Sequence, residues 1–93
     1  MVVGVVKIKI HTPWVHSLKE KRMVVKSLSA KARNQFNVSI AEVEDQDLHQ
    51  SVVLAFACVA GDTAHADSIC DNVLNFLENN TEGDIVSIER EIL

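Results

Sequence analysis

Residues 51–60, SVVLAFACVA, are apolar at every position except Ser51. A continuous apolar run of this length, rich in β-branched residues, is typical of a central strand covered on both faces. Residues 2–10, VVGVVKIKI, alternate at their end between apolar residues and lysines, which indicates a second strand. The chain is therefore expected to build its core around a β-sheet.

Two further strands and two helices are predicted around this pair. Residues 36–44 and 84–93 read as strands, and the alternation in 36–44 changes phase, which predicts a β-bulge near residues 40–42. One helix begins at Ser17, where SLKE forms a capping box with Glu20, and runs to about Asn34. A second helix follows the N-cap candidate Asp62 and ends within residues 78–83.

The resulting order is βαββαβ within one domain, residues 1–93. Two right-handed crossovers give a four-stranded antiparallel sheet in spatial order 4-1-3-2 with both helices on one face. The sequence thus predicts the α+β class and a ferredoxin-like sandwich.

One face of such a sheet is left uncovered by the helices. If Val52, Leu54 and Phe56 face the helices, their neighbours along the same strand lie on the uncovered face. An apolar patch of that size on a soluble chain usually marks an interface, so we expect a homodimer or another partner there. The predicted interface residues are Val3, Val5, Val53, Ala55, Ala57 and Val59, with Ala41, Val43 and Ile85 at its margin.

Charge is divided unevenly along the chain. Residues 1–41 hold eight Lys and Arg against one acid, Glu20, a net charge of +7, whereas residues 42–93 hold Arg90 against twelve acids, a net charge of −11. In the first predicted helix, Leu18, Val25, Leu28 and Ala32 mark the buried stripe, and the spacing of Lys19, Arg22, Lys26 and Arg33 puts these four on an exposed flank.

That basic flank is the first candidate for a working surface. We expect it to contact the phosphates of RNA, ribosomal RNA in particular. The residues that we assign to RNA or partner binding are Lys19, Lys21, Arg22, Lys26, Arg33 and Trp14. Three alternatives stay open: a solvated helix flank, cations paired with the acids of the second half, and a homodimeric module that binds an acidic protein without nucleic acid.

The loop HTPWVH, residues 11–16, carries the only proline and the only tryptophan. Trp14 is either an exposed anchor beside the basic helix or a lid over the core edge. His11, His16 and His49, with Asp45 and Asp47 expected nearby, have suitable chemistry for metal ligands. They are weak candidates because no pair of them has the i, i+3 or i, i+4 spacing of a helical metal motif. We expect no metal and no cofactor.

No pattern in the chain points to catalysis. It lacks a nucleophile elbow and a phosphate-binding glycine loop, and the loop after the first strand has no glycine for an acylphosphatase-like site. Cys58 and Cys70 have neither metal nor redox spacing, which favours reduced thiols and a cytoplasmic location. No apolar window approaches the ~20 residues of a spanning helix, and no signal peptide is indicated. We therefore expect a binding protein rather than an enzyme.

Three stretches carry a family resemblance: VGVVKIKIHTPWVHSLKEKRMVVKSL, FNVSIAEVEDQDL and SIEREIL. They resemble the YlxP-like proteins, a bacterial family of unknown function, over essentially the whole chain. HTP and SLKEKR, residues 11–13 and 17–22, are the most specific part. The resemblance implies a ferredoxin-like fold and a link to translation, because such proteins are commonly encoded beside ribosome-maturation and initiation factors; it supplies no catalytic residues.

Overall fold

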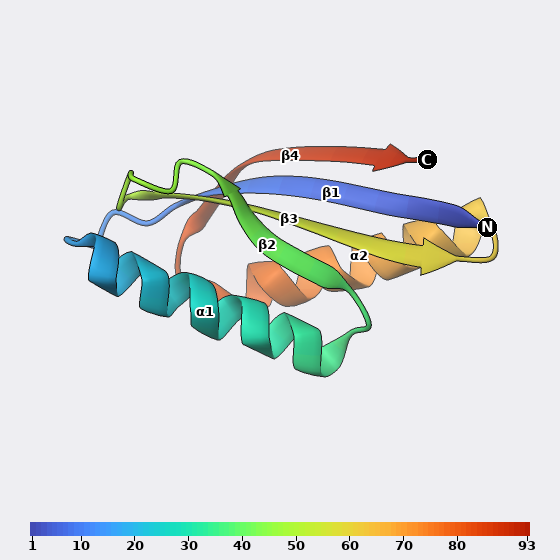
Figure 1. Ribbon diagram of the computed structural model, residues 1–93, viewed down its shortest axis with the longest axis horizontal. Helices are drawn as coiled ribbons and strands as arrows, with labels where there is room; N and C mark the ends of the chain where they lie inside the picture. Colours follow the sequence, from blue (N-terminus) through green and yellow to red (C-terminus); the bar gives the residue numbers. More distant parts are fainter.

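Four strands and two helices alternate along residues 1–93, all of which the computed structural model describes (Figure 1). The order is βαββαβ, as predicted. The elements are β1 (Val2–His11), α1 (Leu18–Gln35), β2 (Ser39–Glu44), β3 (Ser51–Ala60), α2 (Thr63–Asn80) and β4 (Asp84–Ile92).

The sheet is antiparallel throughout, with strand order β2-β3-β1-β4. This order confirms the ferredoxin-like topology. β1 and β3 form the centre and pair along their whole length, from Val2 opposite Ala60 to His11 opposite Ser51. Both helices lie on one face of the sheet, and the chain termini lie at the same end of the molecule (Figure 1).

The core lies between the sheet and the two helices. Alternate residues of the central strands point into it, among them Ile8 of β1 and Leu54 and Phe56 of β3, each no more than 2% exposed. Leu28 of α1 and Leu77 of α2 cover them from the helix side. Fully burying each such side chain stabilises the fold by ~1.5–3 kcal/mol, so this layer dominates the folding free energy.

Each helix begins at a capped residue. The Ser17 hydroxyl accepts a hydrogen bond from the Glu20 amide at 3.1 Å, and the Asp62 carboxylate accepts one from the His65 amide at 2.8 Å. The reciprocal bond from the Ser17 amide to Glu20 is absent, so α1 has half of the predicted capping box. Neither helix has the length and apolar composition needed to cross a membrane.

Two features of the edge strands differ from the prediction. β2 begins at Ser39 rather than at residue 36, because the amide of Phe36 caps α1 on the carbonyl of Ala32 and its ring packs edge-to-face on Phe76. The bulge falls between Glu42 and Glu44, not at residues 40–42.

A second bulge lies in β4, and because of it the prediction that Ile85 belongs to the interface is wrong. The register between β1 and β4 shifts at Lys9 and Ile10, so that Val86 is passed over and Ile85 pairs with Ile10. Ile10 faces the helices, and Ile85 therefore packs against the core instead of lying on the uncovered face.

Candidate functional site

The basic flank of α1 consists of Lys19, Arg22, Lys26 and Arg33. All four residues are exposed, and none of them forms an ion pair with a carboxylate. The Arg33 guanidinium donates a hydrogen bond to the Ile40 carbonyl at 3.2 Å, which places this flank alongside the edge strand β2. The flank is thus a row of cations that faces solvent.

Lys21 does not belong to this surface, and its prediction as a binding residue is wrong. Its side chain is only 1% exposed, although lysine is rarely buried. The ammonium donates to the backbone carbonyls of Asp45 and Leu48, the latter at 2.6 Å. It also lies 2.8 Å from Glu42 Oε2, a buried oxygen that accepts no well-oriented hydrogen bond, so charge holds this pair together. Lys21 therefore fastens the β2–β3 turn to α1.

The two lysines of β1, Lys7 and Lys9, also form ion pairs. On the uncovered sheet face, Lys7 Nζ lies 2.5 Å from Glu44 and 3.1 Å from Glu89, and Lys9 Nζ lies 3.7 Å from Asp45. The hydrogen bond that Lys7 donates to Glu44, and then the one that it donates to Glu89, raises the pKa of Lys7. The acids of the second half thus neutralise the cations of β1 but leave the basic flank free.

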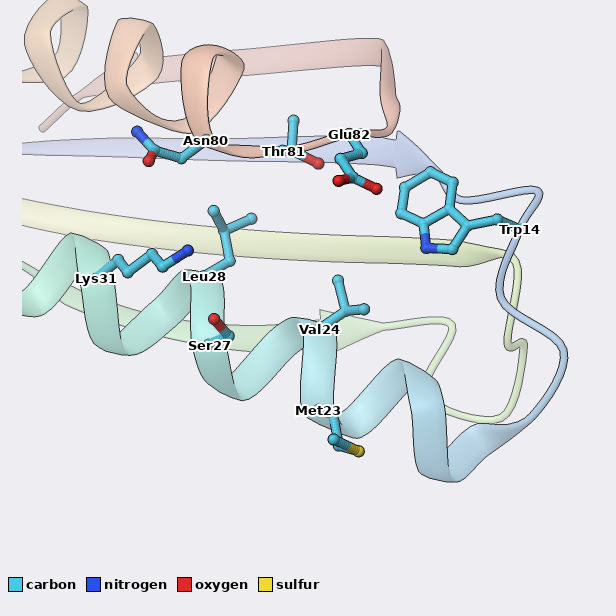
Figure 2. A pocket seen from close by; sticks show the side chains of 9 residues that line it. All are labelled: Trp14, Met23, Val24, Ser27, Leu28, Lys31, Asn80, Thr81 and Glu82. Atoms are coloured by element: carbon cyan, nitrogen blue, oxygen red, sulfur yellow. The ribbon is translucent and has the colours of Figure 1, made fainter.

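Trp14 lies away from the basic flank. Together with Val24, Leu28 and Lys31 it lines a groove on the opposite side of α1, between that helix and residues 80–82 (Figure 2). Its side chain is 36% exposed, so it neither stands fully in solvent nor is buried over the core edge. We call this feature the Trp14 groove.

The predicted interface residues lie on the uncovered sheet face, which we call the open face. The pairings align Val3 with Val59 and Val5 with Ala57. Val59 is 67% exposed, but Val53 is only 4% exposed because it sits among the charged side chains of Lys7, Lys9 and Glu44. The prediction that Val53 is available to a partner is therefore wrong, whereas Val3, Val5, Ala55, Ala57 and Val59 are accessible.

The three candidate histidines, His11, His16 and His49, form no ligand set. His11 Nδ1 is 3.1 Å from the Gln50 carbonyl, and the His49 carbonyl accepts from the Thr12 hydroxyl. His16 is exposed and makes no hydrogen bond. No three His, Cys, Asp or Glu side chains converge as metal ligands anywhere in residues 1–93.

Cys58 and Cys70 are free, buried thiols. Burial, and secondarily the neighbouring Cys58, raises the pKa of Cys70 to about 11. A thiol with so high a pKa is a poor nucleophile at neutral pH. Gly4 lies against both sulfurs, and its missing side chain is what allows the two thiols to pack there.

Sequence reasoning missed two features, and one of them left a signal. Lys21 precedes Val25 by four residues and Leu28 by seven, so the helical period alone places it on the buried stripe. Its positive charge led us to group it with the exposed lysines. The Trp14 groove left no local signal, because it forms only where the loop after β1 meets the end of α2.

Comparisons with known proteins agree with this fold. A de novo designed protein with a ferredoxin fold superposes with a TM-score of 0.58 at 19% identity, over 99% of this chain and 85% of the designed one. CrmK, a flavoenzyme involved in shunt product recycling in caerulomycin biosynthesis, superposes with a TM-score of 0.61 at 14% identity. That match covers 99% of this chain but 19% of CrmK. These likenesses show the fold alone.

Sequence comparison is more specific. The uncharacterized protein YlxP of Bacillus subtilis (strain 168) is 37% identical over 76 residues, which make up 82% of this chain and 77% of that protein. A family model described as "Protein of unknown function (DUF503)" matches residues 3–90. The chain therefore belongs to this YlxP-like family of proteins of unknown function, as its sequence motifs indicated.

Proposed function

We propose that this chain is a non-enzymatic RNA-binding protein that places the basic flank of α1 on a phosphate backbone, with ribosomal RNA as its first candidate partner. One observation carries the proposal: four cations on one side of a capped helix are exposed and have no carboxylate partner. An RNA partner of this kind implies a cytoplasmic location.

The dimensions of the flank suit several consecutive phosphates. Lys19 and Arg33 are fourteen residues apart, which is ~21 Å along a helix at 1.5 Å per residue. Neutralising four phosphates gives a slope of about −3 to −4 in a plot of log affinity against log salt. Raising the salt from ~50 to ~200 mM is then expected to weaken binding about 50- to 150-fold.

The open face is not suited to reading bases. Sheets that read RNA stack bases on exposed aromatic side chains. Here the open face carries valine, alanine and paired charges, and Phe56 of β3 is buried on the opposite side. Contacts to phosphate fix orientation rather than sequence, so the basic flank by itself gives little sequence preference.

Sedimentation of cell extract through a density gradient tests the partner class. The proposal expects the protein to co-migrate with ribosomal particles and to be released by nuclease. A variant with Lys19→Glu, Arg22→Glu and Lys26→Glu should lose that co-migration while keeping its helical circular dichroism. Co-migration that survives nuclease would instead indicate an acidic protein partner and would refute RNA binding.

The open face supports a second proposal, self-association with another copy of this chain. The strands have ten, six, ten and nine residues, which at ~3.3 Å per residue and ~4.8 Å between strands offer ~550 Å² of projected area, about two thirds of the ~800 Å² per partner of a stable interface. Because Lys7 and Lys9 already pair with Glu44, Glu89 and Asp45, a second copy meets few uncompensated charges.

Light scattering tests this proposal. The mass in solution should be twice the 10.3 kDa of one chain, and Ala57→Glu with Val59→Glu should halve it. Asn72→Glu with Asn75→Glu, both on the exposed side of α2, is the charge-matched control and should leave the dimer intact. A monomer mass for the unaltered chain at high concentration would contradict dimerisation.

A further inference from the structure

The Trp14 groove is an open hollow of about 300 Å³ on the flank of α1 that faces α2 (Figure 2). Val24 and Leu28 project into it from α1, and Trp14 lies at one end on the loop after β1. Asn80, the last residue of α2, and the following Thr81 and Glu82 form the facing wall. Its volume is at the lower limit of small-molecule pockets, ~300–1,000 Å³.

The lining combines apolar surface with a polar rim. Its four apolar residues are Trp14, Met23, Val24 and Leu28, and its five polar residues are Ser27, Lys31, Asn80, Thr81 and Glu82. A flat ring with apolar faces and hydrogen-bonding edges satisfies both parts. An acyl chain would leave the rim unpaired, and an anion placed inside would meet the Glu82 carboxylate, so a neutral heteroaromatic ring is the best chemical match.

A nucleobase has this chemistry. Indole rings stack on bases of any sequence, carboxylates accept from exocyclic amino groups, and asparagine both donates and accepts at a base edge. Glu82 supplies the carboxylate, Asn80 keeps its amide oxygen and one N–H free beside its hydrogen bond to the Phe76 carbonyl, and Lys31 is exposed at the rim. The Glu82 carboxylate would repel a phosphate inside the groove but can accept a hydrogen bond from a base, so the groove favours the base over the phosphate.

The groove and the basic flank lie on opposite sides of the same helix. An α-helix with its side chains is only ~10–12 Å across, so one strand of RNA can pass over α1 with phosphates on one side and a base on the other. Exposed Met23 also lines the groove, at 65% exposure, and provides apolar surface at its rim.

We propose that the Trp14 groove binds one unpaired nucleobase of the RNA whose phosphates contact the basic flank of α1. The inference rests on the proposed RNA-binding function and extends it, because it assigns a preference for single-stranded RNA. Bases held in a duplex are already stacked and cannot enter the groove.

Trp14 is the only tryptophan in the chain and reports directly on its own site. Its emission is measured while a single-stranded 15-nucleotide RNA of mixed sequence, or a blunt duplex of equal charge, is added at low salt. Fluorescence anisotropy of end-labelled RNA measures affinity in parallel. The single strand should quench Trp14 emission, and the duplex should leave it unchanged.

Two variants separate stacking from electrostatics. Trp14→Leu should weaken single-strand binding about tenfold and leave duplex binding unchanged, consistent with the value of one base stack. Val86→Leu, an apolar change at an exposed position of β4, is the control and should alter neither. Circular dichroism verifies that both variants are folded.

The outcomes distinguish this inference from the function beneath it. If both RNAs bind with salt-dependent affinity but Trp14 is not quenched and Trp14→Leu binds normally, the base site is refuted and the phosphate surface stands. If neither RNA binds, the proposed function fails and this inference fails with it.

Discussion

Replacing Lys21 by methionine is expected to destabilise the protein by about 3–5 kcal/mol. Methionine keeps most of the volume of the stem, so the change removes the ammonium without opening a large cavity. The Leu48 carbonyl then loses its donor, and the Asp45 carbonyl keeps only the Leu48 amide as a donor. An acceptor left without a partner costs ~1–3 kcal/mol.

The Glu42 carboxylate also loses its counterion. Its side chain is 17% exposed and keeps some contact with water, which holds the total near the range for a broken buried pair. The double variant Lys21→Met with Glu42→Gln removes the stranded charge and should recover about 1 kcal/mol. Against a total stability of ~5–15 kcal/mol, the single change is large enough to unfold part of the population.

Urea unfolding followed by circular dichroism and by Trp14 emission measures this effect. The two probes should report one transition with an unchanged slope. Lys26→Met, at an exposed position of the same helix, is the matched control and should stay within ~0.5 kcal/mol of the unaltered protein. A Lys21→Met variant equally close to the unaltered protein would refute the assignment of Lys21 as a buried fastener of the β2–β3 turn.

The packing around the buried thiols gives two further predictions. Gly4→Ala should cost about 1–3 kcal/mol, because its Cβ would lie 2.9 Å from Cys70 Sγ and 3.1 Å from Cys58 Sγ, whereas Gly61→Ala, with no atom within 4 Å, should be neutral in the same urea experiment. Equal effects of the two changes would contradict this packing. The raised pKa of Cys70, about 11 in the folded chain against 9.0, means that the unfolded chain loses this proton first as the pH rises. The contribution of the Cys70 thiol to the free energy of unfolding is fully present below pH ~9 and falls by about 2–3 kcal/mol as the pH rises toward ~11. The Cys70→Ala variant should lack that part of the decline. An identical alkaline profile for that variant would show that Cys70 is not the group responsible.

The topology was predictable because short-range patterns carry it. The alternation in residues 2–10, the apolar run at residues 51–60 and the caps at Ser17 and Asp62 each identify an element from neighbouring residues alone. The two bulges shift the pairing of β2 and β4 with their neighbouring strands by one or two residues. Sequence patterns do not locate shifts of that size. Val86 is an example: nothing local shows that the ladder passes over it.

The candidate site was less predictable because its chemistry depends on distant contacts. Charge alone grouped Lys21 with Lys19 and Arg22, yet two carbonyl acceptors and one carboxylate from residues 42–48 draw only Lys21 inward. Val53 lost its exposure to long side chains from a neighbouring strand, since lysine stems cover apolar surface while their ammonium groups reach the acids. Such arrangements follow from the assembled sheet and helix and not from spacing along the chain.

The central claim is that one flank of α1, and not the charge of the helix as a whole, binds RNA. Lys26→Glu and Lys31→Glu make the same charge change on opposite sides of the same helix, both at exposed positions. Fluorescence anisotropy of a labelled blunt RNA duplex, titrated at ~50 and ~200 mM salt, compares them, because a duplex engages the phosphate surface alone. We expect Lys26→Glu to weaken binding and reduce the salt slope by about one, with little change for Lys31→Glu. Equal losses for both variants, or no loss for Lys26→Glu, would contradict the claim.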